Sequence, residues 1–235
     1  MTLRGAAIVV TGGLGALGSV VAEEALARGA SVAVIDHAAA PPGGLAERLG
    51  SNALILGGVD LSSPESAKTA MEAVKARFGR IDALLNVAGG FHWQKLADGQ
   101  GPDAWDRMFA LNLKTTLNAS LAALPHLMAA GAGRIVNVGA EAGIKASEGM
   151  GPYAASKAAV HRLTESLAQE LKLSGVTVNA VLPSIIDTPA NRASMPDAAF
   201  DRWVKPAELA AVMLFLASQE AQAVTGALIP VTGRT

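Results

Sequence analysis

Tyr153 and Lys157 are the residues of this sequence whose types and spacing most clearly suggest chemistry. They stand four residues apart, so in a helix they lie on one face, one turn from each other. A tyrosine phenol titrates near pH 10 and exchanges protons poorly at neutral pH, but a neighbouring cation lowers its pKa. General acid catalysis is most effective when the pKa lies near the working pH. The pair is therefore a candidate for delivering a proton to a substrate.

A glycine-rich stretch near the N-terminus is typical of a dinucleotide-binding turn. Gly13, Gly15 and Gly18 satisfy the pattern G-x-G-x-x-G between a predicted strand and a predicted helix. Glycines let the backbone approach a pyrophosphate, and the helix N-terminus offers free N–H groups. A tight turn without a ligand is the alternative. The cofactor contacts expected from this stretch are Gly12, Gly13, Leu14, Gly15, Ala16, Leu17 and Gly18.

Asp36 ends the next predicted strand, 18 residues after Gly18. A carboxylate at this point can accept hydrogen bonds from the adenosine ribose hydroxyls, and it repels a 2′-phosphate. No Arg or Lys follows immediately, so the sequence favours NAD over NADP as cofactor. The alternative is that Asp36 only caps a turn after the strand.

Two further predicted strands end in residues that suit a ligand-binding edge. Asp60 and Leu61 follow the third strand, and Asn86, Ala88 and Gly89 follow the fourth. In open α/β sheets ligands bind at the carboxyl ends of the strands, so these residues are candidate cofactor contacts. Turn chemistry explains the Asp, Asn and Gly residues equally well.

These candidates must be positioned by short apolar runs that alternate with longer amphipathic segments. The apolar runs are 6–10, 31–35, 53–59, 81–86, 134–138, 176–182 and 227–231. The helical patterns lie near 16–28, 65–78, 103–129, 152–173 and 206–217. This alternation predicts an α/β fold, a parallel sheet with helices on both faces. Residues 183–205 show little periodicity and follow a strand end, so we expect a substrate-side loop or lid there.

Composition narrows the functional class. The chain has 235 residues, no cysteine and a net charge of −1, which fits a single domain over residues 1–235 and argues against nucleic acid as the partner. It has no long uncharged apolar run, and its N-terminus leads directly into a strand rather than a signal peptide, so we expect a cytoplasmic protein away from membranes. The four histidines show no metal-ligand spacing, so no metal is expected. We expect His126 and His161 to be solvated or at an interface.

Five landmarks occur in order along the chain: Thr11-Gly12 with the following glycines, residues 86–89, Asn112, residues 153–157 and Pro183. Together they resemble the short-chain dehydrogenase/reductase family, from residue 5 to about residue 232. The resemblance implies a Rossmann-type, doubly wound, seven-stranded sheet in three αβα layers. It also implies hydride transfer between a nicotinamide dinucleotide and a small-molecule substrate.

The resemblance also implies residue roles. Tyr153 would be the proton donor, Lys157 would lower its pKa and hold the nicotinamide ribose, and Asn112 would position a water in the proton relay. Asn112 could instead only cap or bridge helices. The expected cofactor contacts are completed by Tyr153, Lys157, Pro183, Ile186 and Thr188. In this family the helices equivalent to 103–129 and 152–173 pack across a two-fold axis, which implies a homodimer or homotetramer.

Ala140 departs from the family pattern. The family places a serine about 13 residues before the tyrosine, where its hydroxyl bonds the substrate carbonyl, and this position is Ala140 here. Ser147 is closer to Tyr153 but lies in an expected loop, so we do not expect it to substitute. Losing one preorganised donor costs on the order of 10²–10³ in rate. Either catalysis is slow, or the substrate needs little polarisation.

One branch of the family, dihydropteridine reductase, resembles the chain most and shares the missing serine. The similar stretches are 12–19, 87–91, 139–142, 182–183, 187–189, 191–192 and 194–196, with Phe200 and Trp203. That branch reduces a quinonoid dihydropterin with NADH. Asn112 and the bulky segment 91–94 do not fit the branch, so a general carbonyl reductase or alcohol dehydrogenase is the alternative, and a non-catalytic dinucleotide sensor is a third reading. Phe91 and Trp93 could stack on a flat heterocycle or be core or interface aromatics.

Overall fold

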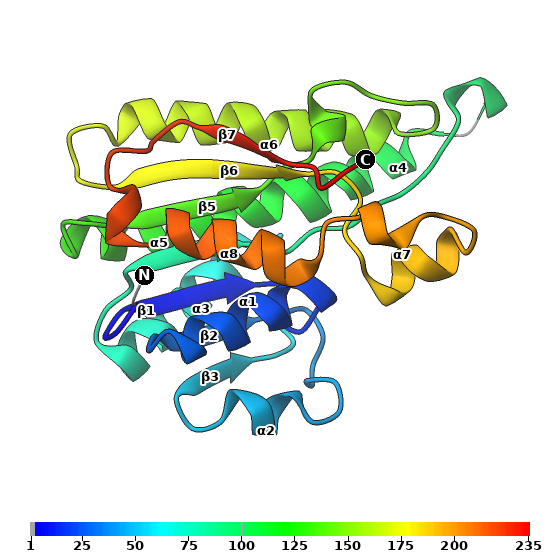
Figure 1. Cartoon of the computed structure of the whole chain (residues 1–235). Helices are drawn as coiled ribbons and strands as arrows, with labels where there is room; N and C mark the ends of the chain where they lie inside the picture. The colour runs from blue at the N-terminus through cyan, green and yellow to red at the C-terminus, as the bar shows by residue number, and fades with distance from the viewer. Residues whose placement is uncertain (1–2, 100) are drawn as a thin grey trace.

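The structure is a computed structural model that describes residues 3–99 and 101–235; Met1, Thr2 and Gln100 lie outside the described residues. Seven parallel strands form one sheet in the order β3-β2-β1-β4-β5-β6-β7 (Figure 1). The strands are β1 Ala7–Thr11, β2 Ser31–Ile35, β3 Ala53–Leu56, β4 Ala83–Asn86, β5 Arg134–Val138, β6 Thr177–Pro183 and β7 Leu228–Val231. The predicted single-domain, doubly wound, seven-stranded sheet is confirmed.

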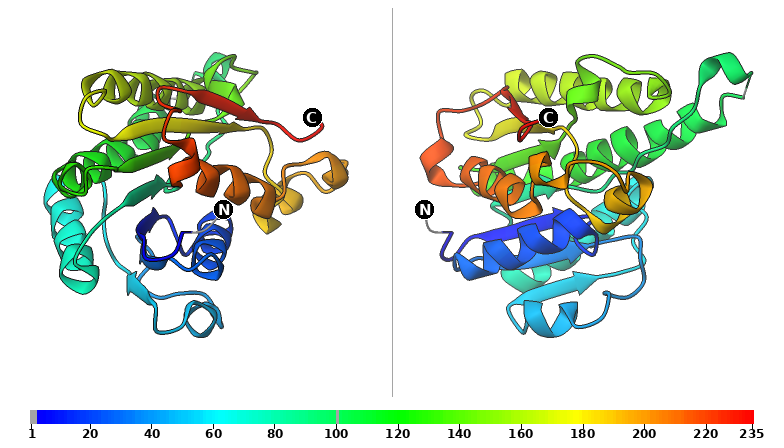
Figure 2. Two further views of the ribbon diagram at one scale, coloured as in Figure 1. Left: turned by 60° about the vertical axis from the view of Figure 1, so that its left-hand side comes forward. Right: turned by 45° about the vertical axis from the view of Figure 1, so that its right-hand side comes forward.

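Helices cover both faces of this sheet, as Figure 2 shows from two sides. The helices are α1 Ala16–Ala27, α2 Leu45–Leu49, α3 Pro64–Phe78, α4 Asp103–Met108, α5 Thr115–Ala129, α6 Gly151–Glu170, α7 Pro189–Ser194 and α8 Pro206–Leu216. Two apolar cores result, one beneath α1, α2 and α8 and the other beneath α3, α5 and α6. The central strands β1, β4, β5 and β6 are buried along their whole length, which explains their unbroken apolar sequences.

The helix starts follow from local sequence. Proline occupies the first turn of α3, α6, α7 and α8, where its missing N–H would be unbonded in any case. Ser63 and Thr188 cap α3 and α7, and their hydroxyls accept from the backbone N–H groups of Ser66 and Asn191. None of the helices in the described residues is long and apolar enough to cross a membrane.

Two predicted segments differ from the structure, and one short helix was not predicted. The helix expected over 103–129 is interrupted by a π-helical turn, η2, at Phe109–Lys114. The five-residue α2 was missed because so short a helix shows no periodicity. The predicted loop 183–205 contains α7, and it is fastened by a bridge between Ile186 and Val204. Val204 and Trp203 are buried, so the end of this segment is anchored to the domain.

The candidate residues lie at the carboxyl edge of the sheet. At this edge the strand order reverses between β1 and β4. Ligands bind at such a switch point in open α/β sheets. Thr11 at the end of β1 ties the two strands together, because its hydroxyl accepts from the N–H groups of Val87 and Ala88, both at 3.1 Å. All strands run in one direction, so their carboxyl ends meet at this edge, together with α4 and α7 at the right of Figure 1.

Candidate functional site

Tyr153 and Lys157 lie one turn apart near the start of α6, as the spacing predicts. Lys157 is buried, and its ammonium donates to the carbonyl oxygen of Val138 at the end of β5, at 2.8 Å. The Tyr153 ring is half-buried and meets the Phe91 ring edge-on, with centroids 5.0 Å apart. The pair therefore stands at the carboxyl edge of the sheet, held by β5 and by the segment after β4.

The pKa values of the pair differ from the sequence expectation. Lys157 was expected to lower the pKa of Tyr153, but burial dominates and raises that pKa to about 12. Burial likewise lowers the pKa of Lys157 to about 8. Since the Lys157 ammonium is bonded to Val138, it does not offset the desolvation of the phenol in this structure. Tyr153 therefore keeps its proton throughout the neutral range and suits the role of an acid.

The Asn112 side chain is fully buried and forms hydrogen bonds with the backbone of Gly90 and the hydroxyl of Ser156. Its side-chain oxygen accepts from the N–H of Gly90 at 2.9 Å, and its amide donates to the carbonyl of Gly90 at 3.1 Å. The same amide donates to the hydroxyl of Ser156 at 2.9 Å. The π-helical turn η2 carries the residue, and such turns are frequent at functional sites. In this structure Asn112 joins the loop after β4 to α6, which matches the bridging alternative.

Ser156 was not predicted as a site residue, although it lies inside the Tyr153–Lys157 stretch. It is fully buried, accepts from Asn112 and donates to the carbonyl oxygen of Tyr153 at 2.7 Å. A chain of hydrogen bonds thus runs from Gly90 through Asn112 and Ser156 to the Tyr153 backbone. Its place one residue before Lys157 is the sequence signal that could have identified it.

Position 140 is buried and offers no hydroxyl, as the sequence indicated. The N–H of Ala140 donates to Nε2 of His161 at 3.3 Å. A methyl group added at Gly139 or Gly143 would lie 2.5 Å from the His161 ring, so the turn around Ala140 is shaped against this imidazole. Ser147, by contrast, is exposed in the loop before α6.

The prediction that His161 is solvated or at an interface is wrong. His161 is 1% exposed, and burial, together with the positive charges of Arg162 and Lys157, lowers its pKa to about 4. The helical periodicity was ambiguous here because the buried face of α6 that carries His161 also holds Ser156, Lys157 and Thr164. The other helical histidine, His126, lies mostly buried with Nε2 3.5 Å from a carboxylate oxygen of Glu72.

The glycine-rich turn fits a dinucleotide phosphate. Gly12 has a φ of +63°, and a Cβ on Gly18 would lie 2.2 Å from the Gly12 carbonyl oxygen, so both are required by the fold itself. Gly15 differs because it is exposed at the N-cap of α1. A Cβ added to it would have its nearest contact at 3.3 Å, with the carbonyl oxygen of Gly12. No side chain caps this helix, so its first N–H groups are free for a ligand. Leu14 and Leu17 are buried, whereas Ala16 is exposed beside Gly15.

Asp36 lies directly after β2 and accepts two backbone hydrogen bonds. One carboxylate oxygen accepts from the N–H of Leu14 and the other from the N–H of Ala38, both at 2.9 Å. The turn-capping alternative is therefore realised. The contact with Leu14 also places the carboxylate beside the glycine-rich turn. Each carboxylate oxygen keeps a second lone pair, so the side chain can still accept from a ribose hydroxyl.

The remaining predicted cofactor contacts have mainly local partners. Asp60 accepts from the backbone and hydroxyl of Ser62, which lowers its pKa, and Leu61 is buried. Asn86 is buried and donates to Ser120 on α5 and to Asn137 on β5, so its amide nitrogen links β4 to these elements rather than facing a ligand.

The other contacts predicted at this edge lie at strand ends or in turns. Pro183 ends β6, the carbonyl of Ile186 accepts from Asn191, and Thr188 caps α7. Ala88 donates to Thr11 and lies beside Gly12, whereas a Cβ on Gly89 would be 3.4 Å from the Lys157 ammonium. Within residues 3–99 and 101–235 no three side chains that bind metals gather into a metal site.

Several apolar side chains are exposed, and one of them, Phe91, contacts Tyr153. Phe91, Trp93 and Ile144 expose 55%, 49% and 66% of their surface. Trp93 lies against Gly149, where an added Cβ would be 2.0 Å from the indole nitrogen, and the Lys95 ammonium stands 5.6 Å from the indole centroid. Of the two readings for these aromatics, a core role is excluded by their exposure.

Comparison with known proteins now places this site in a family. The family model for short chain dehydrogenase matches residues 6–199. The chain belongs to the short-chain dehydrogenase/reductase family. It is thus an oxidoreductase of a family that works with NAD(H) or NADP(H), and the glycine-rich turn and Asp36 fit such a cofactor.

Several relatives are similar over nearly the whole chain. A 3-oxoacyl-[acyl-carrier-protein] reductase of Vibrio harveyi is 33% identical over 241 residues, covering 99% of this chain and 98% of the relative. A 4-formylbenzenesulfonate dehydrogenase of Comamonas testosteroni is 33% identical over 248 residues with the same coverage. A solved short-chain dehydrogenase/reductase from Mycobacterium ulcerans has a TM-score of 0.92 at 27% identity, covering 99% of this chain and 90% of that one.

The structure of an NAD⁺-bound xylitol dehydrogenase has the same fold, with a TM-score of 0.91 at 23% identity over 99% of this chain and 100% of that one. The two relatives at 33% identity are, by name, a reductase of a 3-oxoacyl compound and a dehydrogenase of a formyl compound. The resemblance to dihydropteridine reductase finds no support among them, whereas the general dehydrogenase/reductase alternative fits.

Proposed function

We propose that the protein interconverts a carbonyl compound and its alcohol with NAD(H), with Tyr153 as the proton donor in the reducing direction. The observation that carries the proposal is the cluster of Tyr153, Lys157 and Asn112 at the switch point of the sheet. The bound dinucleotide would supply the hydride. Tyr153, whose pKa lies at about 12, would hold the proton that the reduced oxygen receives.

NADH is the proposed cofactor rather than NADPH. Asp36 places a carboxylate next to the N–H of Leu14 in the glycine-rich turn, where a 2′-phosphate would meet its negative charge. The expected result is a dissociation constant at least tenfold lower for NADH than for NADPH, measured by fluorescence titration. Equal affinities would contradict this choice.

Activated carbonyl compounds are the proposed substrates, aromatic aldehydes among them. Ala140 supplies no hydroxyl to polarise a carbonyl, so a substrate that is already electrophilic fits best. Phe91, in contact with Tyr153, and the nearby Trp93 present exposed aromatic faces on which a flat substrate can stack. One relative, by its name, acts on an aromatic aldehyde, 4-formylbenzenesulfonate.

Quinonoid dihydropteridine is a second candidate substrate, favoured by Ala140 alone. Such an electron-poor ring needs a proton donor more than a group that polarises a carbonyl. A panel of aromatic aldehydes, ketones and quinonoid dihydropterin, assayed with NADH and NADPH, separates the candidates. The proposal predicts the highest kcat/KM for an aldehyde with NADH. Turnover of the pterin alone would favour the second candidate, and binding of NADH without any turnover would favour a dinucleotide sensor.

A homodimer or homotetramer is the proposed assembly. Leu121 and Met128 on α5 expose 52% and 48% of their surface, as expected for a helix that packs against a second copy. Light scattering coupled to size-exclusion chromatography tests this directly. A mass of about 24 kDa, that of one chain, would contradict it.

A further inference from the structure

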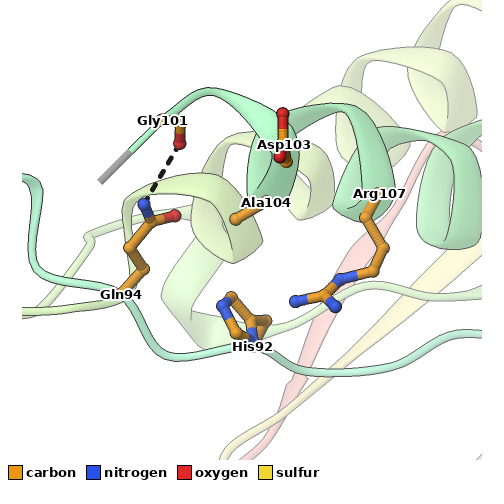
Figure 3. A pocket seen from close by; sticks show the side chains of 6 residues that line it. All are labelled: His92, Gln94, Gly101, Asp103, Ala104 and Arg107. Carbon is orange, nitrogen blue, oxygen red and sulfur yellow. Dashed lines mark hydrogen bonds between the residues drawn. The ribbon is translucent and has the colours of Figure 1, made fainter.

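A small cavity lies between the segment that follows Phe91 and the start of α4, and the chemistry described above does not use it. Its volume is about 260 Å³, below the usual range for a pocket that holds a whole drug-sized ligand, so it suits a small group. The lining residues are His92, Gln94, Gly101, Asp103, Ala104 and Arg107 (Figure 3). We refer to it as the α4 cavity.

The α4 cavity contains a buried acceptor without a donor. Gln94 is 3% exposed, and its backbone N–H is fixed to the carbonyl of Gly149 at 2.8 Å. Its side-chain amide donates to the carbonyl of Gly101 at 3.2 Å, which fixes the orientation of the amide. The side-chain oxygen then accepts no hydrogen bond from any residue that the structure describes. Leaving such an atom unbonded costs about 1–3 kcal/mol, so the site calls for a donor.

Two nitrogen-bearing side chains face the same space. In Figure 3 the Arg107 guanidinium and the His92 ring point toward each other across the α4 cavity. Arg107 and Asp103 are four residues apart on α4, a spacing that permits an ion pair. Among the residues that the structure describes, no ion pair joins these two side chains. The guanidinium therefore has its hydrogen-bond donors available to a ligand, and it disfavours a bound cation.

We propose that the α4 cavity binds a small anion, a carboxylate or phosphate group. Arg107 and His92 donate to the anionic oxygens, and where the anion carries a hydroxyl, as hydrogen phosphate does, that hydroxyl donates to the side-chain oxygen of Gln94. A guanidinium suits this task because its planar fork matches the oxygens of a carboxylate or a phosphate. His92 follows Phe91 directly, and Phe91 contacts Tyr153, so binding in the α4 cavity is linked to the catalytic tyrosine through one peptide unit.

Titration of inorganic phosphate into the NADH-saturated protein, followed by ³¹P NMR, tests the site. Saturating NADH occupies the glycine-rich turn, which would otherwise bind phosphate. Arg107→Ala should weaken phosphate binding about tenfold or more, since a charge-assisted hydrogen bond is lost. Asp103→Asn should tighten it several-fold, because a negative charge in the cavity wall is removed.

The matched control is Arg162→Ala, which removes the same charge from the exposed side of α6, where Arg162 pairs with Glu165. Both arginines are exposed, so neither substitution should unfold the protein. Phosphate binding that is absent from the wild type would overturn the proposal. Equal binding by the Arg107→Ala and Arg162→Ala proteins would overturn it as well.

A kinetic comparison then identifies the source of the anion. This arm rests on the proposed catalytic activity, whereas the phosphate titration requires only that NADH binds. If the anion is the tail of a substrate held at Tyr153, Arg107→Ala should raise KM for 4-carboxybenzaldehyde about tenfold and leave KM for benzaldehyde unchanged. If the anion is a separate ion, the substitution should leave both KM values unchanged. Failure of the wild type to reduce either aldehyde would count against the proposed function and leave the phosphate result standing.

Discussion

At the scale of single residues, burial and not the neighbouring charge decides the protonation of Tyr153 and Lys157. The structure places the Lys157 ammonium on the carbonyl of Val138 and a half-buried Tyr153 phenol one turn away. Both charged forms are therefore disfavoured, which gives a tyrosine pKa of about 12 and a lysine pKa of about 8. A protonated phenol over the whole neutral range is what reduction of a carbonyl requires.

Position 140 yields the first prediction at this scale. Ala140→Ser supplies the missing hydroxyl, so kcat for an unactivated ketone should rise by tens-fold, with 10²–10³ as the upper bound. An activated aldehyde or a quinonoid ring should gain little, because it needs less polarisation. The matched control is Ala140→Cys, which has a similar volume and a poor donor. An equal gain with Cys, or no gain on ketones with Ser, would contradict this account of position 140.

Motif spacing singles out Tyr153, Lys157, Asn112 and Ala140 in the sequence, but it does not reveal the residues that hold them. His161 looked like a solvated helical residue, yet it is buried against the turn that carries Ala140. A histidine on a mixed helix face gives no signal of its partner, because that partner comes from a distant β5 turn. Ser156 was overlooked although it lies within the Tyr153–Lys157 stretch, because its partner Asn112 is distant in sequence.

At the scale of elements, the turn between β1 and α1 contains two kinds of glycine. Gly18 is required by the fold, whereas Gly15 is expected to be required by the cofactor. Gly18→Ala should lower Tm, because the added methyl would lie 2.2 Å from the carbonyl oxygen of Gly12. Gly15→Ala should leave Tm of the cofactor-free protein nearly unchanged but weaken NADH binding about tenfold or more. Scanning calorimetry and fluorescence titration measure the two effects. A Gly15→Ala protein that binds NADH normally would contradict the assignment of this turn.

Most strands and long helices could be predicted from sequence, and the reason is burial. The central strands are buried on both faces, so their sequences are unbroken apolar runs bounded by turn residues. The π-helical turn at Phe109–Lys114 could not be predicted, because its residues are ordinary helix formers and its position depends on the contact of Asn112 with Gly90. The bridge between Ile186 and Val204 likewise joins residues with no local signal.

At the scale of the whole molecule, His161 links stability to pH. Its pKa is about 4 in the folded protein and near 6.5 when unfolded, so between these values the unfolded chain binds more protons. The free energy of unfolding should therefore be unaffected by His161 above pH 6.5. It should fall as the pH drops from 6.5 to 4, by about 3 kcal/mol at most.

Urea titrations of the wild type and of His161→Gln at pH 7.0 and pH 4.5 isolate this contribution. Gln keeps an acceptor for the Ala140 N–H and does not titrate, so the variant should lose less stability between the two pH values. Carboxylates titrate alike in both proteins and cancel in the comparison. An identical pH dependence for the two proteins would contradict the buried, neutral state of His161.

The central claim, that Tyr153 delivers a proton at a dinucleotide site, is tested most directly by NADH-dependent reduction of an aromatic aldehyde by the wild type and Tyr153→Phe. General acid catalysis is worth about 10²–10⁴-fold, so kcat should fall by at least about a hundredfold while the dissociation constant for NADH changes little. Equal kcat values for the two proteins would contradict the claim.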